Sequence, residues 1–284
     1  MQIYDKENSV KPFVKWVGGK GRNLKNLFKF VPEHISTYVE PFVGGGAMLF
    51  ALKFDKAIIN DSNSELINAY CIIRDDVNEL IRLLKDMPYE LEFYKEIRAW
   101  DREQDFLNRA SVERAARFIY LLKTCFNGLY RVSKKNYFNT PFGKFVNPNI
   151  CNVENLMAVH EFLNTHDIEI RCGNYEDLID LIPKDSFVYF DPPYAPISST
   201  SNFTSYQPGQ WGDLEQRNLA RHCDELNRRK IKFMESNSTA QICFDLYKKY
   251  QINTLDAKRY INAVGTGRGN IKELVITNYD LQNM

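Results

Sequence analysis

Seven short runs of β-branched and aromatic residues, each bounded by turn residues, set the strongest limits on what this chain can fold into. Runs of this length and composition predict β-strands. They cover residues 37–43, 57–60, 168–171, 187–190, 231–235, 252–255 and 274–277. Because most of them alternate with helical patterns, we expect an α/β domain whose largely parallel sheet carries helices on both faces.

One long segment interrupts this alternation. Between residues 61 and 149 the strand pattern disappears, and apolar residues instead recur at helical spacing, as in Val112, Ala115, Ile119 and Leu122. The helical patterns give way at residues 127–146 to a loop rich in Asn, Lys, Tyr and Phe. This segment is typical of an insertion into the α/β domain. A further helix is predicted at residues 214–228.

Composition excludes several classes of protein. With 284 residues, of which 44% are hydrophobic, the chain can bury a substantial core. It has no apolar run of about eighteen residues, and residues 1–11 lack the apolar centre of a secretory signal. We therefore expect a cytoplasmic protein without membrane contact. The six cysteines form no C-x-x-C pair, so we expect no metal site, and the thiols to be buried or inert.

The positive charge is unevenly distributed, although the net charge is only +1. Two segments contain basic residues with no acid between them, and both also carry aromatic residues. Their basic residues are Lys11, Lys15, Lys20, Arg22, Lys25 and Lys29 in the first, and Lys123, Arg131, Lys134, Lys135 and Lys144 in the second. A single basic run is usually a solvated face, but two such segments with aromatic residues favour a nucleic-acid-binding surface.

A glycine-rich turn follows the first predicted strand. Residues 40–46 read Glu-Pro-Phe-Val-Gly-Gly-Gly and precede a predicted helix at 48–53. Glycines let the backbone approach a ligand closely, and a helix N-terminus attracts negative charge, so a cofactor carboxylate or phosphate suits this turn. The spacing matches neither the dinucleotide fingerprint nor the phosphate loop of nucleoside triphosphatases.

An acid, Asp61, ends the next predicted strand. An acid at this place in an α/β domain typically binds the hydroxyls of a ribose. It is equally suited to cap a helix predicted at 62–73. The sequence leaves both roles open.

The most informative motif is Asp191-Pro192-Pro193-Tyr194, which follows a strand predicted to be buried. Prolines cannot donate backbone hydrogen bonds, so the motif predicts a rigid pocket rich in acceptors and poor in donors, closed by an aromatic ring. The exocyclic amine of adenine has two protons that only acceptors can engage. Asp191 and a proline carbonyl would supply these acceptors and favour the geometry in which the lone pair points at a methyl donor. Tyr194 would stack on the purine.

The order of these motifs resembles one known family. The glycine turn at 40–46 and the motif at 191–194, with a helical insertion between them, are similar to the Dam-type DNA adenine-N6 methyltransferases, alpha class, of the DpnII-like branch. The resemblance covers nearly the whole chain. Lys15-Trp16-Val17-Gly18-Gly19-Lys20 resembles the family's N-terminal cofactor motif, and residues 127–131 and 138–143 resemble its DNA-reading segment.

The resemblance implies a Rossmann-like class I methyltransferase fold. Its sheet is expected to be seven-stranded and mostly parallel, with an inserted, mainly helical DNA-recognition domain. The catalytic domain would comprise residues 1–60 and 166–284, the recognition domain residues 61–165, and the DNA-reading loop would lie near 126–145.

The resemblance also implies a cofactor, S-adenosyl-L-methionine, and no metal. The expected cofactor contacts are Trp16, Lys20, Glu40, Pro41, Phe42, Gly44, Gly46, Asp61, Asn174, Tyr175 and Asp191. The catalytic residues are expected to be Asp191, Pro192, Pro193 and Tyr194. In one place the chain departs from the family, because Asn174 follows a glycine where the family commonly has an acid. An Asn side chain can still accept a hydrogen bond from an amino group.

The implied partner is double-stranded DNA, read at 5′-GATC-3′ sites, with no obligatory protein partner. Phe126 is expected to insert where the flipped adenine has left, and the expected base contacts are Lys15, Asn127, Leu129, Arg131 and Pro141. An arginine such as Arg131 can grip O6 and N7 of guanine. The expected location is the cytoplasm of a bacterial or phage-infected cell, on the nucleoid.

The expected reaction is base flipping followed by direct in-line methyl transfer to N6 of adenine. Two alternatives remain open. One is an exocyclic amine of RNA, or N4 of cytosine, as the acceptor, since the motif at 191–194 suits any such amine. The other is a catalytically silent DNA-binding homologue.

Overall fold

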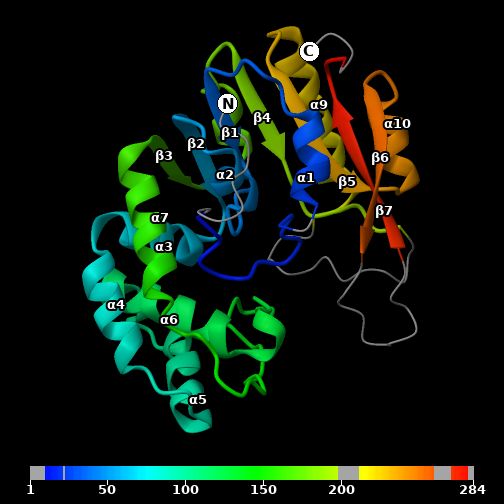
Figure 1. Ribbon diagram of the computed structural model, residues 1–284. Coiled ribbons are helices and arrows are strands. Elements are labelled where there is room, and N and C mark those ends of the chain that lie inside the picture. The colour runs from blue at the N-terminus through cyan, green and yellow to red at the C-terminus, as the bar shows by residue number, and fades with distance from the viewer. Residues whose placement is uncertain (1–9, 22, 198–210, 259–269, 281–284) are drawn as a thin grey trace. The chain divides into compact units, whose positions relative to one another are not determined.

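The computed structural model describes residues 10–21, 23–197, 211–258 and 270–280 of the chain (Figure 1). Its seven strands form one sheet in the order β3-β2-β1-β4-β5-β7-β6. They are β1 (Thr37–Glu40), β2 (Lys56–Asp61), β3 (Asp167–Cys172), β4 (Ser186–Phe190), β5 (Lys232–Ser238), β6 (Gln251–Lys258) and β7 (Asn270–Thr277). The predicted fold, an α/β protein with a seven-stranded and mostly parallel sheet, is confirmed.

The described residues cluster into two compact units. Residues 10–20 and 43–174 belong to the first unit, and the remaining described residues belong to the second. The two ends of the proposed recognition domain, residues 61–165, stay a prediction.

The first unit contains β2 and β3, which pair in parallel with Lys56 opposite Asp167 and Asp61 opposite Cys172. Helices α3 and α7 pack against these strands, and α3 packs on α6. The helices of this unit are α2 (Ala47–Leu52), α3 (Ser64–Asp75), α4 (Val77–Asp86), α5 (Leu91–Ala99), α6 (Ser111–Thr124) and α7 (Val153–Thr165), with short 3-10 turns η2 (Trp100–Arg102), η3 (Phe106–Asn108) and η4 (Phe126–Gly128). Residues 62–149, all of which are described, contain no named strand, which agrees with the predicted helical insertion.

The second unit contains β4 between β1 and β5, with both neighbours parallel to it. Strand β7 then pairs antiparallel with both β5 and β6. The helices of this unit are α1 (Leu24–Leu27), α8 (Glu176–Ile179), α9 (Asp213–Arg228) and α10 (Gln241–Tyr247), with the 3-10 turn η1 (Phe28–Phe30). Helix α9 packs against β5, and α10 packs against β6. The helix predicted at 214–228 is therefore confirmed as α9.

Strand β4 is buried along its whole length, because its neighbours cover both edges and apolar side chains cover both faces. Fully buried strands read as continuous apolar runs, which is why Phe187, Val188, Tyr189 and Phe190 could be predicted from sequence. The carboxyl end of this strand delivers Asp191. Parallel strands bring their carboxyl ends to one edge, where α/β proteins usually bind ligands.

Two local expectations need correction. The strand predicted at 37–43 ends at Glu40, and residues 41–43 form a turn. Helix α3 begins at Ser64 rather than at residue 62. Of the six cysteines, Cys172 is exposed at the end of β3. No helix among the described residues is long and apolar enough to cross a bilayer.

Candidate active site and nucleic-acid interface

The Asp191 to Tyr194 loop is held by hydrogen bonds to its backbone. The Pro193 carbonyl accepts from the Gln216 side-chain amide at 3.0 Å, and the Ala195 N–H donates to the Asn237 side-chain oxygen at 3.1 Å. The Ala195 carbonyl accepts from the Ser238 hydroxyl at 2.6 Å. Helix α9 and strand β5 thus fix the loop on both sides of Tyr194. Neither Gln216 nor Asn237 was predicted as a site residue, because neither belongs to a motif that is recognisable in the sequence.

The loop has the acceptor character that its prolines predict. Asp191 is half-buried at the end of β4. No described residue donates a hydrogen bond to the Pro192 carbonyl, whereas the Pro193 carbonyl is already engaged by Gln216. A ligand amine would therefore find its acceptors in the Asp191 carboxylate and the Pro192 carbonyl.

The hydroxyl end of Tyr194 is buried, although the residue as a whole is partly exposed. Burial and the nearby charge of Asp191 raise the pKa of Tyr194 well above its ordinary value, while a hydrogen bond with Ser236 opposes them. The phenol therefore stays neutral, and its exposed part can serve as a platform for a planar ring.

Three aromatic rings cluster in the second unit. Phe42 lies 4.9 Å from Tyr175 and 5.4 Å from Trp211, measured between ring centroids, and Tyr175 lies 5.7 Å from Trp211. The Trp211 indole N–H is buried and has no hydrogen-bond partner among the described residues. Phe42 and Tyr175 were predicted to contact the cofactor, but Trp211 was not, because no motif marks it. Such a cluster suits the stacking of a purine.

Glu40 ends β1, and Pro41 connects it to Phe42 of this cluster. Glu40 is 3% exposed, and its charge adds to the effect of burial in raising the pKa of Tyr38. These two residues belong to the second unit together with Phe42, Tyr175 and the catalytic loop.

The glycine turn of the first unit is built around Asp61. The Asp61 carboxylate accepts backbone hydrogen bonds from Gly44 at 3.0 Å and from Asn63 at 2.9 Å. The N-cap of α3 is Asn63, whose side chain accepts from the Leu66 N–H, so the expectation that Asp61 caps this helix is wrong. Asp61 instead orders the turn, because its carboxylate accepts from the Gly44 N–H while Asn63 caps the helix.

The burial of Asp61 affects its charge. It is 8% exposed, and burial raises the pKa of its carboxyl group, although hydrogen bonds from the backbone of Asn63, Gly44 and Ser62 oppose this effect. A carboxylate has about four acceptor positions, so it can accept further bonds from a ligand. These acceptor positions fit the hydroxyls of a ribose.

Gly44 must be glycine for two reasons. Its φ is +48°, and a Cβ there would lie 2.5 Å from Cδ1 of Trp16. The Gly44 carbonyl also accepts from the Tyr70 hydroxyl at 3.0 Å, and a Cβ on Gly46 would lie 2.6 Å from that same hydroxyl oxygen. The turn therefore packs directly on the Trp16 indole. Helix α2, which follows the turn, has only six residues.

Trp16 and Lys20 belong to the same unit as Gly44 and Asp61. Trp16 is half-buried, and its indole stacks on the Tyr130 ring with centroids 5.3 Å apart. Lys20 is 5% exposed rather than a surface charge, and its ammonium group donates to the Gly18 carbonyl at 2.9 Å. A buried cation of this kind suits a ligand carboxylate. Asn174 follows β3 in the same unit.

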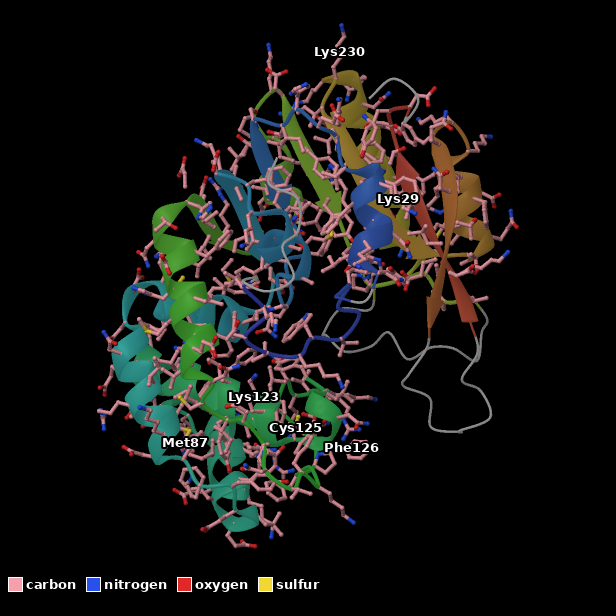
Figure 2. All side chains as sticks on the ribbon, viewed as in Figure 1. Lys29, Met87, Lys123, Cys125, Phe126 and Lys230 are labelled. Atoms are coloured by element: carbon pink, nitrogen blue, oxygen red, sulfur yellow. The ribbon has the colours of Figure 1, made fainter. Side chains whose placement is uncertain are left out.

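The predicted DNA-reading residues come together in the first unit. The Lys15 ammonium group donates to the Asn127 carbonyl at 2.7 Å, and the Phe126 N–H donates to the Pro141 carbonyl at 2.8 Å. Phe126 lies beside Cys125 just after α6, and its side chain is 53% exposed (Figure 2). Lys15, Asn127 and Pro141 are exposed too, so these groups are available to a partner.

Arg131 is held in place by Asn139. Its Nε donates to the Asn139 side-chain oxygen at 2.6 Å, and its Nη2 donates to the Asn139 carbonyl at 3.0 Å. A guanidinium has five N–H groups, so the end edge formed by Nη1 and Nη2 still has donors for a base. The half-buried Leu129 lies two residues before it, and the Leu129 carbonyl accepts from the Thr140 hydroxyl at 2.6 Å.

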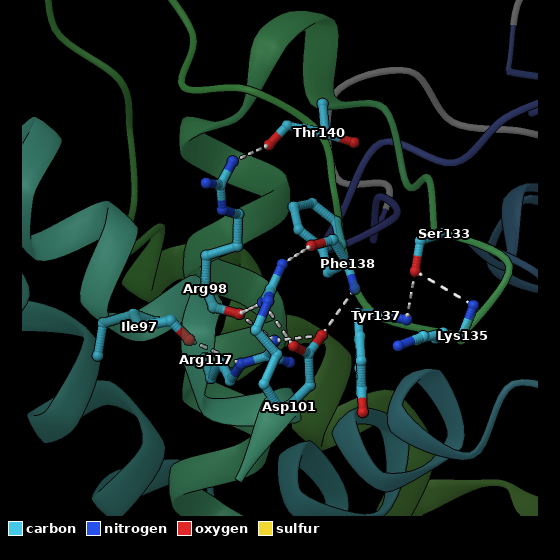
Figure 3. Close-up of polar contacts among 10 residues, drawn as sticks. Ile97, Arg98, Asp101, Arg117, Ser133, Lys135, Tyr137, Phe138 and Thr140 are labelled. Atoms are coloured by element: carbon cyan, nitrogen blue, oxygen red, sulfur yellow. Dashed lines mark hydrogen bonds and ion pairs between the residues drawn. The ribbon is translucent and has the colours of Figure 1, made fainter.

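We define the reading segment as residues 126–145. Asp101 supports this segment through polar contacts (Figure 3). Its carboxylate accepts from the Phe138 N–H at 2.7 Å and forms ion pairs of 2.8 Å with both Arg102 and Arg117. Burial lowers the pKa of the Arg117 guanidinium, and the charge of Asp101 opposes this effect. Arg102 also donates to the Phe138 carbonyl at 3.1 Å. The segment therefore rests on the helical part of its unit and is not a free loop.

The candidate residues are divided between the two compact units. The first unit holds Lys15, Trp16, Lys20, Gly44, Gly46, Asp61, Phe126, Asn127, Leu129, Arg131, Pro141 and Asn174. The second unit holds Glu40, Pro41, Phe42, Tyr175, Asp191, Pro192, Pro193 and Tyr194. Among the described residues no cluster of His, Cys, Asp and Glu has the arrangement of a metal site.

Comparison with known proteins gives a consistent result. Residues 16–261 match the family described as D12 class N6 adenine-specific DNA methyltransferase. The type II methyltransferase M1.LlaDCHI of Lactococcus lactis subsp. cremoris is 41% identical, covering 95% of this chain and 96% of that protein. The type II methyltransferase M.MjaIII of Methanocaldococcus jannaschii is 41% identical over 95% and 99% of the two chains. The DNA adenine methylase of Escherichia coli K12 is 30% identical over 93% of each.

Proposed function

The chain belongs to the D12 class of N6 adenine-specific DNA methyltransferases, and on that premise we propose that it methylates adenine in duplex DNA at 5′-GATC-3′ sites. Membership of the family makes it an enzyme that acts on DNA adenine and uses a methyl donor. The site sequence, the base flipping and the roles of single residues are the proposal. The observation that carries it is the acceptor pair of Asp191 and Pro192 beside the partly exposed ring of Tyr194.

The target amine donates one hydrogen bond to the Asp191 carboxylate and one to the Pro192 carbonyl. Pro193 takes no part as an acceptor, because its carbonyl already binds Gln216. Holding both protons favours the pyramidal amine, whose lone pair is then available for direct in-line transfer. No covalent intermediate on the protein is needed.

Tyr194 stacks on the target adenine, which has to leave the duplex at a cost of a few kcal/mol. Stacking of a base on an aromatic ring contributes about 1 to 3 kcal/mol. The exposed ring of Phe126 occupies the space that the adenine leaves. These two rings together offset the cost of flipping.

When bound, S-adenosyl-L-methionine supplies an electrophilic methyl group. The residues fit this cofactor: the buried Lys20 ammonium suits the methionine carboxylate, and the spare acceptor positions of Asp61 suit the ribose hydroxyls. Phe42 and Tyr175 provide aromatic surface for the adenine ring, and Asn174 accepts from its amino group. We assign supporting contacts to Trp16, Glu40, Pro41, Gly44 and Gly46.

Sequence is read by the groups that surround Phe126. Arg131, oriented by Asn139, grips a guanine through its end edge. Lys15 contacts the outer guanine, and Asn127, Leu129 and Pro141 contact the remaining bases. The proposed location of the protein is the bacterial or phage-infected cytoplasm, on DNA, without an obligatory protein partner.

Replacement of Asp191 tests the catalytic proposal. We expect Asp191→Ala to abolish transfer of label from tritiated S-adenosylmethionine to a duplex with one GATC site, while the affinity for that duplex changes little. The wild-type protein and the Asp167→Ala variant, which lacks an exposed carboxylate far from the loop in sequence, are the controls. Retained transfer by Asp191→Ala would refute the role assigned to this residue.

A further inference from the structure

Behind the catalytic loop lies a buried polar chain that the proposed reaction does not use. It runs from the loop through Gln216 on α9 to Asn237 and Glu235 on β5. Gln216 is 1% exposed, and Asn237 and Glu235 are fully buried. Polar side chains are expensive to bury, so a chain of three between α9 and β5 needs a reason.

Every link of this chain has hydrogen-bond geometry. The Gln216 Nε2 donates to the Pro193 carbonyl at 3.0 Å, and its Oε1 accepts from the Asn237 Nδ2 at 3.0 Å. The same Asn237 nitrogen donates to the Glu235 carboxylate at 2.9 Å. The Asn237 oxygen accepts from the N–H groups of Ala195 and Ser238 at 3.1 and 2.8 Å. Gln216 and Asn237 therefore bond to the backbone on either side of Tyr194.

We propose that Gln216 and Asn237 are positioning residues for methyl transfer, which act by fixing the peptide planes that flank Tyr194. This inference rests on the proposed function of the loop. Gln216 engages the Pro193 carbonyl, and this leaves the Pro192 carbonyl as the backbone acceptor for the target amine. The two residues do not touch substrate. Their effect is expected in the rate of the chemical step, because small displacements of acceptors in a reaction site lower rates steeply.

Gln216→Met tests the proposal with a side chain of similar length that can neither donate nor accept these hydrogen bonds. We expect its single-turnover rate of methyl transfer to fall about 10- to 100-fold. Its dissociation constants for duplex and S-adenosylmethionine are expected to stay within about threefold of wild type, since Gln216 contacts neither.

Asn278→Ala is the matched control for a merely structural effect. Asn278 also forms hydrogen bonds with the backbone of β5 and of the residue just before it. Its side chain accepts from the Phe233 N–H at 2.8 Å and donates to the Ile231 carbonyl at 2.8 Å. These bonds lie at the other end of the strand from Asn237. We expect this variant to lose thermal stability but to keep the wild-type transfer rate.

Gln216→Glu supplies a second, independent readout. The carboxyl group that this substitution introduces can donate to the Pro193 carbonyl when it is protonated, but not when it is ionised. The ratio of the variant rate to the wild-type rate should therefore rise as pH falls from about 9 to about 6. Both proteins contain the same titratable groups on the elements around position 216, so the wild-type pH profile is the reference for the ratio: Asp191, Tyr194, Asp213, Glu215, His222, Cys223 and Glu235.

Three results would overturn the inference. They are a wild-type rate in Gln216→Met, an equal rate loss in Asn278→Ala at equal loss of stability, and a flat ratio against pH for Gln216→Glu. If Gln216→Met does not fold, the pH dependence of the ratio between the Gln216→Glu and wild-type rates decides alone. An active wild type with any of these results contradicts only the positioning role, whereas a wild type that transfers no methyl group contradicts the proposed function itself.

Discussion

The Trp16 indole stacks on the Tyr130 ring, with centroids 5.3 Å apart and ring planes inclined by 27°. Trp16 follows Lys15, whose ammonium group binds the Asn127 carbonyl, and it packs against Gly44 of the glycine turn. Tyr130 lies within the reading segment. One indole therefore connects the residues assigned to the cofactor with the residues assigned to DNA.

Loss of this stacking should weaken cofactor binding. Aromatic pairs contribute about 0.5 to 1.5 kcal/mol beyond the area that they bury, so we expect Tyr130→Leu to raise the dissociation constant of S-adenosylmethionine about threefold to tenfold. Isothermal titration calorimetry measures this change. Tyr137→Leu is the control, because Tyr137 lies in the same segment but its ring contacts Arg102 rather than Trp16. This variant should leave the dissociation constant unchanged. Equal effects of the two variants would argue against the connection.

A methyl group at Gly44 should damage the turn more than one at Gly18. Both glycines have positive φ, +48° and +78°, but a Cβ at Gly18 meets no atom within 4 Å. We expect Gly18→Ala to cost about 1 to 2 kcal/mol of unfolding free energy from backbone strain alone. Gly44→Ala should cost about 2 to 5 kcal/mol, because it also displaces Trp16, and it should weaken cofactor binding. Similar unfolding free energies in urea for both variants would contradict this packing.

Arg131→Ala should relax discrimination at one guanine of the site. The lost preference for guanine is expected to be about 1 to 3 kcal/mol, seen as a smaller ratio of affinities between a GATC duplex and a duplex changed at that base. The exposed Lys134 is the control, because Lys134→Ala should weaken binding to both duplexes alike. Uniform weakening by Arg131→Ala would mark this residue as a phosphate contact.

Stability should depend on pH through Glu235. Burial raises the pKa of its carboxyl group from 4.5 to about 7, although hydrogen bonds from Tyr247, Asn237 and Cys223 oppose this. The folded protein then holds a proton that the unfolded chain has released, so this group's contribution to stability falls as pH rises from about 4.5 to about 7. Relative to wild type, Glu235→Gln should gain up to about 3 kcal/mol across this window. Urea unfolding at a series of pH values measures the difference, and a constant difference would contradict the buried carboxyl.

The strands could be predicted because their apolar runs are local. All seven predicted strands correspond to β1–β7, with ends displaced by a few residues. The capping of α3 could not be predicted, because Asp61 and Asn63 are both good caps and the choice depends on the distant Gly44 N–H. The burial of Lys20 is also invisible in a sequence that shows only its charge.

The residues of the candidate site also divide into those that could be predicted from the sequence and those that could not. Asp191 to Tyr194 and the glycine turn could be found because their residues are contiguous and chemically unusual. Trp211, Gln216 and Asn237 could not be found, because their importance comes from contacts with residues distant in sequence: Trp211 with Phe42, Gln216 with Pro193, and Asn237 with Gln216. Arg131 could be proposed as a base contact, but its orientation by Asn139 required the structure.

The product of methyl transfer tests the central claim most directly. Duplexes that differ only at one GATC site are incubated with tritiated S-adenosylmethionine and the wild-type protein, then digested to nucleosides and separated. We predict that label appears in N6-methyladenine from the GATC duplex and is absent from the duplex without the site. Label in N4-methylcytosine, equal label in both duplexes, or no label in either would contradict the account.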